Sequence, residues 1–118
     1  METEVKRAYE PPAPGDGRRV LVDRIWPRGV ARDDLHIDAW LKELAPSAGL
    51  RKWFGHDPSK WEEFKERYAR ELDERRDALA QLLEMAKSGR VTLVFGARDI
   101  EHNNAVALRE YLALRSRR

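Results

Sequence analysis

Two short runs of consecutive apolar residues, set far apart in the chain, most constrain how this sequence can fold. One lies in residues 18–25, where Val20, Leu21 and Val22 follow one another, and the other is VTLVF at residues 91–95. Continuous apolar runs of this length are typical of strands buried on both faces of a parallel sheet. The connection between them is long and helical in character, so the two strands are predicted to lie side by side and parallel.

Another strand is predicted near the N-terminus, at residues 4–9, where Val5 and Tyr9 share one face. The loop that follows it, PPAPGDG at 11–17, is rich in residues that favour turns. This loop is too short for a crossover between adjacent parallel strands. The strands on either side of it are therefore expected to pair antiparallel or not to be neighbours.

The long connection is predicted to contain helices. In DAWLKEL, residues 38–44, the apolar residues follow helical spacing, and Pro46 ends the stretch. Ser47 can cap a second helix that ends at Gly55. The apolar positions of these two helices are Trp40, Leu41, Leu44, Leu50, Trp53 and Phe54.

A third helix is predicted from Ser59, which forms a capping box with Glu62, to Gly89. At about 28 residues it would be roughly 42 Å long if straight, which is longer than the sheet it covers, so we expect a bend near residues 73–76. A last helix is predicted at 103–115. Together these elements predict an α/β protein with a small three-stranded, mainly parallel sheet packed by helices. The length predicts a single domain over residues 1–118, with 115–118 as a frayed basic tail.

The composition excludes several kinds of site. The chain has no cysteine, which excludes disulfides, thiol catalysis and cysteine-ligated metals. Its three histidines lack the spacing of a metal site, so we expect no metal and no cofactor. No segment resembles a signal peptide or approaches the roughly 20 apolar residues that span a bilayer, which predicts a soluble cytoplasmic protein without membrane contact. The net charge of +2 is close to balanced and gives nucleic-acid binding only weak support.

Charged residues gather where the two buried strands end. The segments that follow them are DRIWPRG at 23–29 and GARDIEHNNA at 96–105. In parallel sheets, ligands bind beyond the carboxyl ends of the strands, so a site is expected here. The segment from Arg18 to Arg32 is the most basic part of the chain, with arginines at positions 18, 19, 24, 28 and 32.

Three stretches resemble a known family. RVLVDRIWPRGV, LAPSAGLRKWFGHDPSKWEEFKERYARELDE and VTLVFGARDIEHNNAVALREYL are similar to the YeaO-like bacterial proteins, a branch of domain of unknown function 488. The resemblance covers about residues 6–112 and implies a small cytosolic α/β domain without an established activity. The family pattern falls on Asp23, Arg24, Trp26, Pro27, Arg28, Gly29, Ser47, Arg51, Trp53, Gly55, His56, Asp99, His102 and Asn103.

This chain departs from that pattern in two ways. Family members often carry a histidine where this chain has Asn104, which puts in doubt any role that needs an imidazole there. The wider family has a helix between the first two strands, where this chain has only the 11–17 loop. That organisation favours a parallel first strand, against the argument from loop length, so its direction stays open.

The residues at the strand ends form the candidate site. The guanidinium groups of Arg28 and Arg98 suit a phosphate or carboxylate. In the alternative, they pair with Asp23 and Asp99 in a structural network. His102 is the candidate acid–base residue, and Asn103 or Asn104 is also expected to cap the last helix. The candidate ligand-binding residues are Asp23, Arg24, Trp26, Arg28, Arg98, Asp99 and Asn103.

Three interpretations of this site remain. The charge balance favours a binder of a small anionic ligand, such as a phosphate ester or nucleotide, or an enzyme acting on it. The second is a nucleic-acid-binding module that uses the Arg18–Arg32 segment on the backbone and Trp26 on a base. In the third, the arginines are only structural. His56 is given a structural role, because the adjacent Asp57 is poorly placed to orient it.

Overall fold

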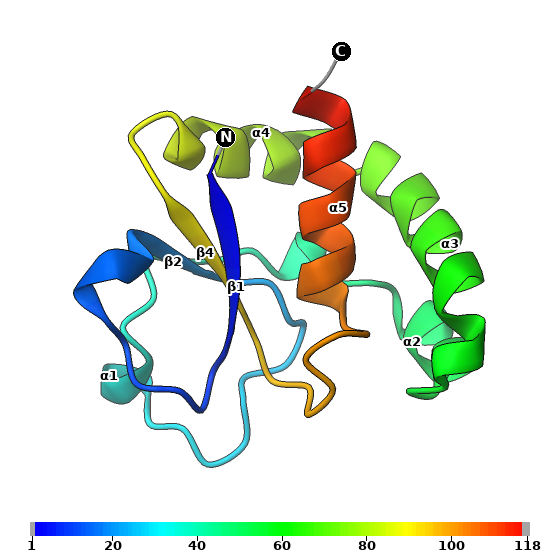
Figure 1. Ribbon diagram of the computed structural model, residues 1–118, viewed down its shortest axis with the longest axis horizontal. Helices are drawn as coiled ribbons and strands as arrows, with labels where there is room; N and C mark the ends of the chain where they lie inside the picture. Colours follow the sequence, from blue (N-terminus) through cyan, green and yellow to red (C-terminus); the bar gives the residue numbers. More distant parts are fainter. Residues whose placement is uncertain (1, 117–118) are drawn as a thin grey trace.

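The sheet is fully parallel, with strand order β1-β4-β2-β3, in a computed structural model that describes residues 2–116 (Figure 1). Within these residues it has four strands: β1 Thr3–Arg7, β2 Arg18–Leu21, β3 Ala39–Trp40 and β4 Val91–Phe95. β2 and β4 are parallel neighbours, with Val20 opposite Leu93, as predicted. The α/β class and the packing by helices are confirmed, and the sheet has one strand more than expected.

The position of β1 resolves its direction. It runs parallel to β4, with Val5 opposite Leu93, and β4 separates it from β2. The loop between β1 and β2 contains a short 3-10 helix, Pro14–Asp16, and crosses over β4. Of the two expected arrangements, antiparallel pairing or strands that are not neighbours, the second is confirmed. A short loop can join β1 and β2 because β4 lies between them.

The additional strand replaces a predicted helix. Residues 38–44 form β3 and a 3-10 helix, Lys42–Leu44, so the prediction of an α-helix in this stretch is wrong. The Asp38 N–H donates to the Arg19 carbonyl at 2.7 Å, and the Leu41 N–H donates to the Leu21 carbonyl at 3.0 Å. A helix of only two turns is weakly stable by itself, so the backbone hydrogen bonds to the edge of β2 decide the conformation of this stretch.

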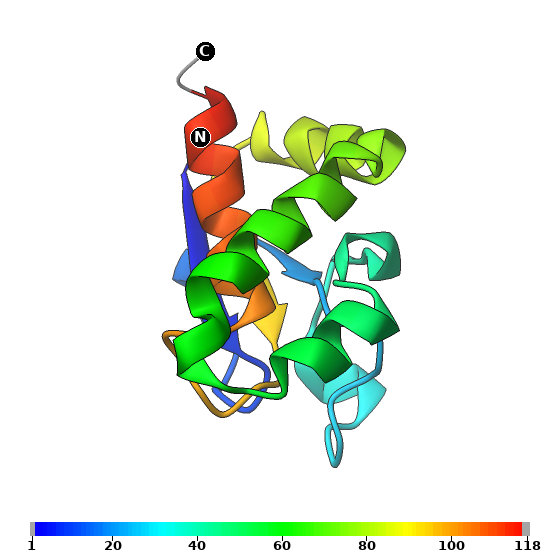
Figure 2. The ribbon, with the colours of Figure 1, turned by 90° about the vertical axis from the view of Figure 1, so that its right-hand side faces the viewer.

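The helices occupy most of the remaining chain: α1 Arg32–Leu35, α2 Ala48–Phe54, α3 Trp61–Asp73, α4 Arg76–Ala86 and α5 Asn104–Ser116. The Ser47 hydroxyl accepts from the Leu50 N–H at the start of α2, and Gly55 ends α2 with φ of 53°, as predicted. The predicted long helix breaks between α3 and α4, inside the expected window. α4 then runs in a different direction, across the end of the molecule (Figure 2).

The start of α3 differs from the prediction. The carboxylate of Asp57 accepts from the Ser59 N–H at 3.0 Å and begins a 3-10 helix, Pro58–Lys60, that leads into α3. The capping box predicted for Ser59 and Glu62 is therefore wrong, because the preceding aspartate takes the capping position. No helix among the described residues is both long enough and apolar enough to cross a membrane.

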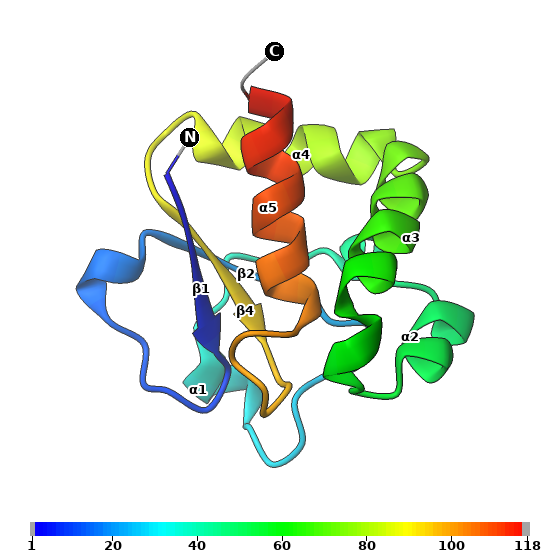
Figure 3. The same ribbon diagram turned by 45° about the vertical axis from the view of Figure 1, so that its right-hand side comes forward.

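Apolar side chains pack on both faces of the sheet. On one face, Val20 and Leu93 meet α2 to α5, which stand together to one side of the strands (Figure 3). On the other face, Leu21 and Val94 pack with Leu35 of α1. Trp40, Trp53 and Trp61 are half-buried at the edges of these clusters.

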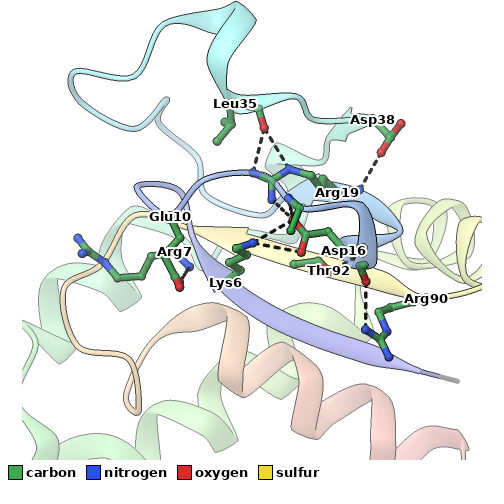
Figure 4. Close-up of polar contacts among 11 residues, drawn as sticks. Lys6, Arg7, Glu10, Asp16, Arg19, Leu35, Asp38, Arg90 and Thr92 are labelled. Carbon is green, nitrogen blue, oxygen red and sulfur yellow. Dashed lines mark hydrogen bonds and ion pairs between the residues drawn. The ribbon is translucent and has the colours of Figure 1, made fainter.

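The loop between β1 and β2 is fixed by a buried ion pair. Asp16 accepts from the Arg19 guanidinium at 2.6 Å and from the Lys6 ammonium at 3.2 Å (Figure 4). The same guanidinium donates two hydrogen bonds to the Leu35 carbonyl, at 3.1 and 2.9 Å. This network ties the loop to β1, β2 and α1, and it removes Arg19 from the basic surface.

The C-terminal end of the described chain is helical. Of the residues predicted to form a frayed tail, Arg115 lies in the last turn of α5, where it forms an ion pair with Asp73 and stacks over Tyr111. Residues 117 and 118 lie outside the described part of the chain.

Candidate functional site

A cavity of about 630 Å³ opens at the carboxyl ends of β1, β2 and β4. Three loops that follow these strands gather here, at the lower end of the sheet in Figure 1, and α2 and α3 close one side. Its described lining residues are Tyr9, Asp23, Arg24, Ile25, Trp26, Pro27, Arg28, Ala45, Pro46, Arg51, Phe54, His56, Phe64, Gly96, Ala97, His102, Asn103 and Asn104. The cavity thus lies where the strand ends predict a site.

Three arginines line this cavity in the described part of the chain. Arg24 and Arg28 come from the loop after β2, and Arg51 comes from α2. Their side chains are exposed, and none makes a hydrogen bond or salt bridge within residues 2–116. Guanidinium groups that line one cavity without forming a salt bridge are suited to a bound anion. The charge of Arg51 also acts on the carboxyl group of Asp23, which lines the same cavity.

Arg98 lies elsewhere. It is exposed on the loop after β4, and it is not among the described residues that line the cavity. Neither Arg28 nor Arg98 forms an ion pair with Asp23 or Asp99 in the described chain, because both carboxylates bind other groups. The predicted network of these four residues is therefore not formed, and neither is a shared cavity for Arg28 and Arg98.

Asp23 joins the strand ends to the last helix. Its carboxylate accepts from the Gly96 N–H at 2.8 Å and from the Asn104 side-chain amide at 3.0 Å. A Cβ atom at position 96 would lie 3.2 Å from this carboxylate, so glycine permits the close approach. Burial raises the pKa of Asp23, although the two hydrogen bonds and the charge of Arg51 act in the opposite direction.

Asp99 orients His102. One Asp99 oxygen lies 2.9 Å from His102 Nδ1, and the other accepts from the Glu101 and His102 N–H groups at 2.9 and 3.0 Å. The hydrogen bond from the Glu101 backbone, and then that from the His102 side chain, lower the pKa of Asp99. Asp99 itself is not among the described lining residues, so it acts on the cavity through His102.

The two asparagines that follow have structural partners. Asn103 is buried and begins α5, because its side-chain oxygen accepts from the Val106 N–H at 2.9 Å. Its amide group donates to the Asp99 carbonyl at 2.9 Å. Asn104 donates to the Val22 carbonyl as well as to Asp23. The expected helix cap is thus Asn103, whose polar side-chain atoms are occupied.

Trp26 shapes the loop after β2. Its indole N–H donates to the Val30 carbonyl at 2.7 Å, and its ring meets Trp40 edge-on at 5.4 Å. The guanidinium of Arg32 lies over the Trp26 ring, 4.9 Å from its centroid. Trp26 therefore lines the cavity as a fixed wall, with much of its ring already in contact with the protein.

Arg51 and His56 are residues of the cavity that were not predicted as ligand contacts. His56 follows Gly55 at the end of α2 and has φ of 57°, a left-handed conformation that is uncommon outside glycine. The two left-handed residues turn the chain so that His56 reaches the cavity. Both residues fall on the family pattern, which was the one signal in the sequence that could have identified them.

Comparisons with known proteins agree on one family. A family model described as the inactive DUF488-N3 subclade matches residues 2–118. An uncharacterised protein of Mycobacterium tuberculosis is 42% identical over 113 residues, which are 94% of this chain and 95% of that protein. The uncharacterised protein YeaO of Escherichia coli is 38% identical over 112 residues, 95% of this chain and 97% of its own. No solved structure matches this chain.

Proposed function

Since the chain belongs to the inactive DUF488-N3 subclade, we propose that it binds a small anionic ligand of phosphate- or nucleotide-like chemistry without transforming it. The observation that carries the proposal is the convergence of Arg24, Arg28 and Arg51 on one cavity, without salt bridges inside the described chain. Planar guanidinium groups bind phosphate and carboxylate oxygens in pairs of parallel hydrogen bonds.

The size and lining of the cavity favour a ligand of nucleotide size. Its volume of about 630 Å³ falls within the range of roughly 300–1,000 Å³ that is common for small-molecule sites. Trp26, Phe54 and Phe64 add aromatic surface to the lining. An anionic group on the arginines and an apolar or aromatic part against these side chains would use both kinds of surface.

The distribution of the basic residues supports a compact ligand over a nucleic-acid strand. Arg19 is buried on Asp16, and Arg32 is stacked on Trp26, so the Arg18–Arg32 segment does not present a continuous row of free cations. A strand of nucleic acid would need such a row along its backbone. Nucleic-acid binding is the alternative, and the salt dependence of oligonucleotide binding distinguishes it from the binding of a small anion.

Thermal unfolding with AMP or inorganic phosphate tests the proposal. A ligand at ten times its Kd stabilises the native state by about 1.4 kcal/mol, which corresponds to a rise in Tm of roughly 4–8 °C. We expect this saturable rise in the wild type, and its loss in a variant that combines Arg28→Ala with Arg51→Ala. Arg98→Ala is the control, because it removes the same charge from an exposed position outside the cavity.

The comparison must be made at matched ionic strength, because phosphate also stabilises proteins by exclusion from their surfaces. That general effect does not saturate and should be equal in all variants. Equal saturable rises in the wild type and in the double variant would contradict the cavity as the binding site. Binding of a single-stranded oligonucleotide that weakens steeply with salt would instead favour the nucleic-acid alternative.

A further inference from the structure

His102 is held in one orientation by two neighbours. Asp99 binds its Nδ1 at 2.9 Å and also accepts from its backbone N–H at 3.0 Å. The Trp61 ring meets the imidazole edge-on, with the ring centroids 5.3 Å apart and the planes at 84°. Trp61 is in turn stacked on the buried Phe64. A half-buried histidine fixed on two sides has lost most of its rotational freedom before any ligand arrives.

The other ring nitrogen remains available. Nε2 of His102 makes no hydrogen bond within the described chain, and the residue lines the cavity. With Nδ1 committed to Asp99, a neutral imidazole offers a lone pair at Nε2, whereas a protonated one offers an N–H donor there. Only the protonated form can donate a hydrogen bond to an anion beside the arginines.

The charged groups around His102 come from several elements. Asp99 lies on its own loop, and Lys65 of α3 lies over the Trp61 ring. The lining of the cavity adds the positive charge of its arginines, a second histidine, His56, and the carboxyl group of Asp23. Asp99 compensates an imidazolium directly, while the arginines oppose it until an anion neutralises them. A bound anion therefore favours the proton on His102, and by reciprocity the proton favours the anion.

We propose that protonated His102 is a direct contact of the anion, so that the cavity binds its ligand more tightly as the pH falls. This inference rests on the proposed function. It restricts the ligand to anions that remain ionised at mildly acidic pH, such as phosphate esters. His102 is then a ligand-binding residue, and Asp99 is the residue that positions it.

The probe for this inference is sulfate, because it stays a dianion over the range in which histidine titrates, about pH 5 to about pH 8. Sulfate affinity is measured by calorimetry at constant ionic strength set with chloride. In the wild type, we expect the Kd to rise by about five- to tenfold across this range. In His102→Gln, we expect the Kd to be the same at every pH in this range, because the glutamine amide does not titrate.

Two further variants separate His102 from other groups. His36→Gln is the matched control, since His36 is exposed at the end of α1 and is not among the described lining residues. It should keep the full pH dependence. Asp99→Asn keeps the imidazole and removes its counter-charge, so the pH at which sulfate binding weakens should fall. This variant also covers the case in which His102→Gln fails to fold.

Each result has one reading. A pH dependence that persists in His102→Gln would overturn the inference and leave the proposed function standing. The inference would also be overturned if Asp99→Asn left unchanged the pH at which sulfate binding weakens. A wild type that binds neither sulfate nor phosphate at any pH would contradict both the inference and the proposed function.

Discussion

Replacing Phe64 with alanine is expected to lower the free energy of unfolding by about 3–5 kcal/mol, as is usual for large aromatic residues in protein cores. Phe64 is only 2% exposed. Its ring stacks on Phe54 at 4.4 Å and also contacts Trp61 and Tyr68, so it joins α3 to α2. Truncation removes these contacts and leaves a void that a rigid core fills only in part.

Urea unfolding followed by circular dichroism measures this effect. Trp61→Ala is the comparison, because Trp61 belongs to the same aromatic group but remains half-buried, and its loss should cost less. A Phe64→Ala variant that loses less than about 1 kcal/mol, or less than Trp61→Ala, would show that this aromatic group is not the centre of the helix packing.

Replacing Arg19 with alanine is expected to cost about 2–4 kcal/mol, because it removes one partner of a buried ion pair. The Arg19 side chain is 5% exposed, and its loss also leaves the Leu35 carbonyl without two donors. Lys6 still binds Asp16 in the variant, which keeps the expected cost below the upper end of the usual range. Arg18→Ala, at the exposed neighbouring position, should change stability by less than about 0.5 kcal/mol.

The pH dependence of stability gives an independent check of this pair. Burial alone would raise the pKa of Asp16, but hydrogen bonds from the Ala13 N–H, Lys6 and Arg19 outweigh it and lower that pKa. The stabilisation is therefore present above the ordinary aspartate pKa of about 3.9 and is lost as the pH falls through the lowered value. Equal stability losses for Arg19→Ala and Arg18→Ala, at neutral and at acid pH alike, would contradict the structural role of the pair.

The elements that sequence patterns predict well are those whose signals are local or long. β4 coincides with the apolar run VTLVF, and α2 begins and ends at its own cap residues Ser47 and Gly55. The break between α3 and α4 follows from the charged residues in the middle of a helix that is too long for the sheet. In each case the information lies within the segment itself.

β3 and the start of α3 show where such patterns fail. Ala39 and Trp40 become a strand because β2 offers an open edge, and nothing within residues 38–44 encodes that edge. In the predicted capping box, the Glu62 side chain would accept from the Ser59 N–H. The Asp57 carboxylate accepts from this N–H instead. Tertiary contacts and competition between neighbouring caps decide these two cases.

The position of the site was predictable from the sequence, but the set of residues that line it was not. Parallel strands bring Asp23, Arg28 and His102 to one cavity, as the strand ends imply. Which loop residue enters the cavity depends on the path of the loop, so Gly96 and Ala97 line it while Arg98 remains outside. Arg51 comes from α2, where its spacing is that of an ordinary exposed helix residue. Only the folded arrangement brings it to the same cavity as Arg28.

The central claim is that an anion binds to the arginines of the cavity, and a titration read at individual guanidinium groups tests it most directly. NMR spectra of the Nε–H groups are recorded while inorganic phosphate is added at constant ionic strength. The signals of Arg28 and Arg51 are predicted to shift along saturating curves with one shared Kd, while the signal of Arg98 shows no saturable change. A saturable shift of Arg98 that equals that of Arg28, or linear shifts at every arginine, would contradict an anion site in this cavity.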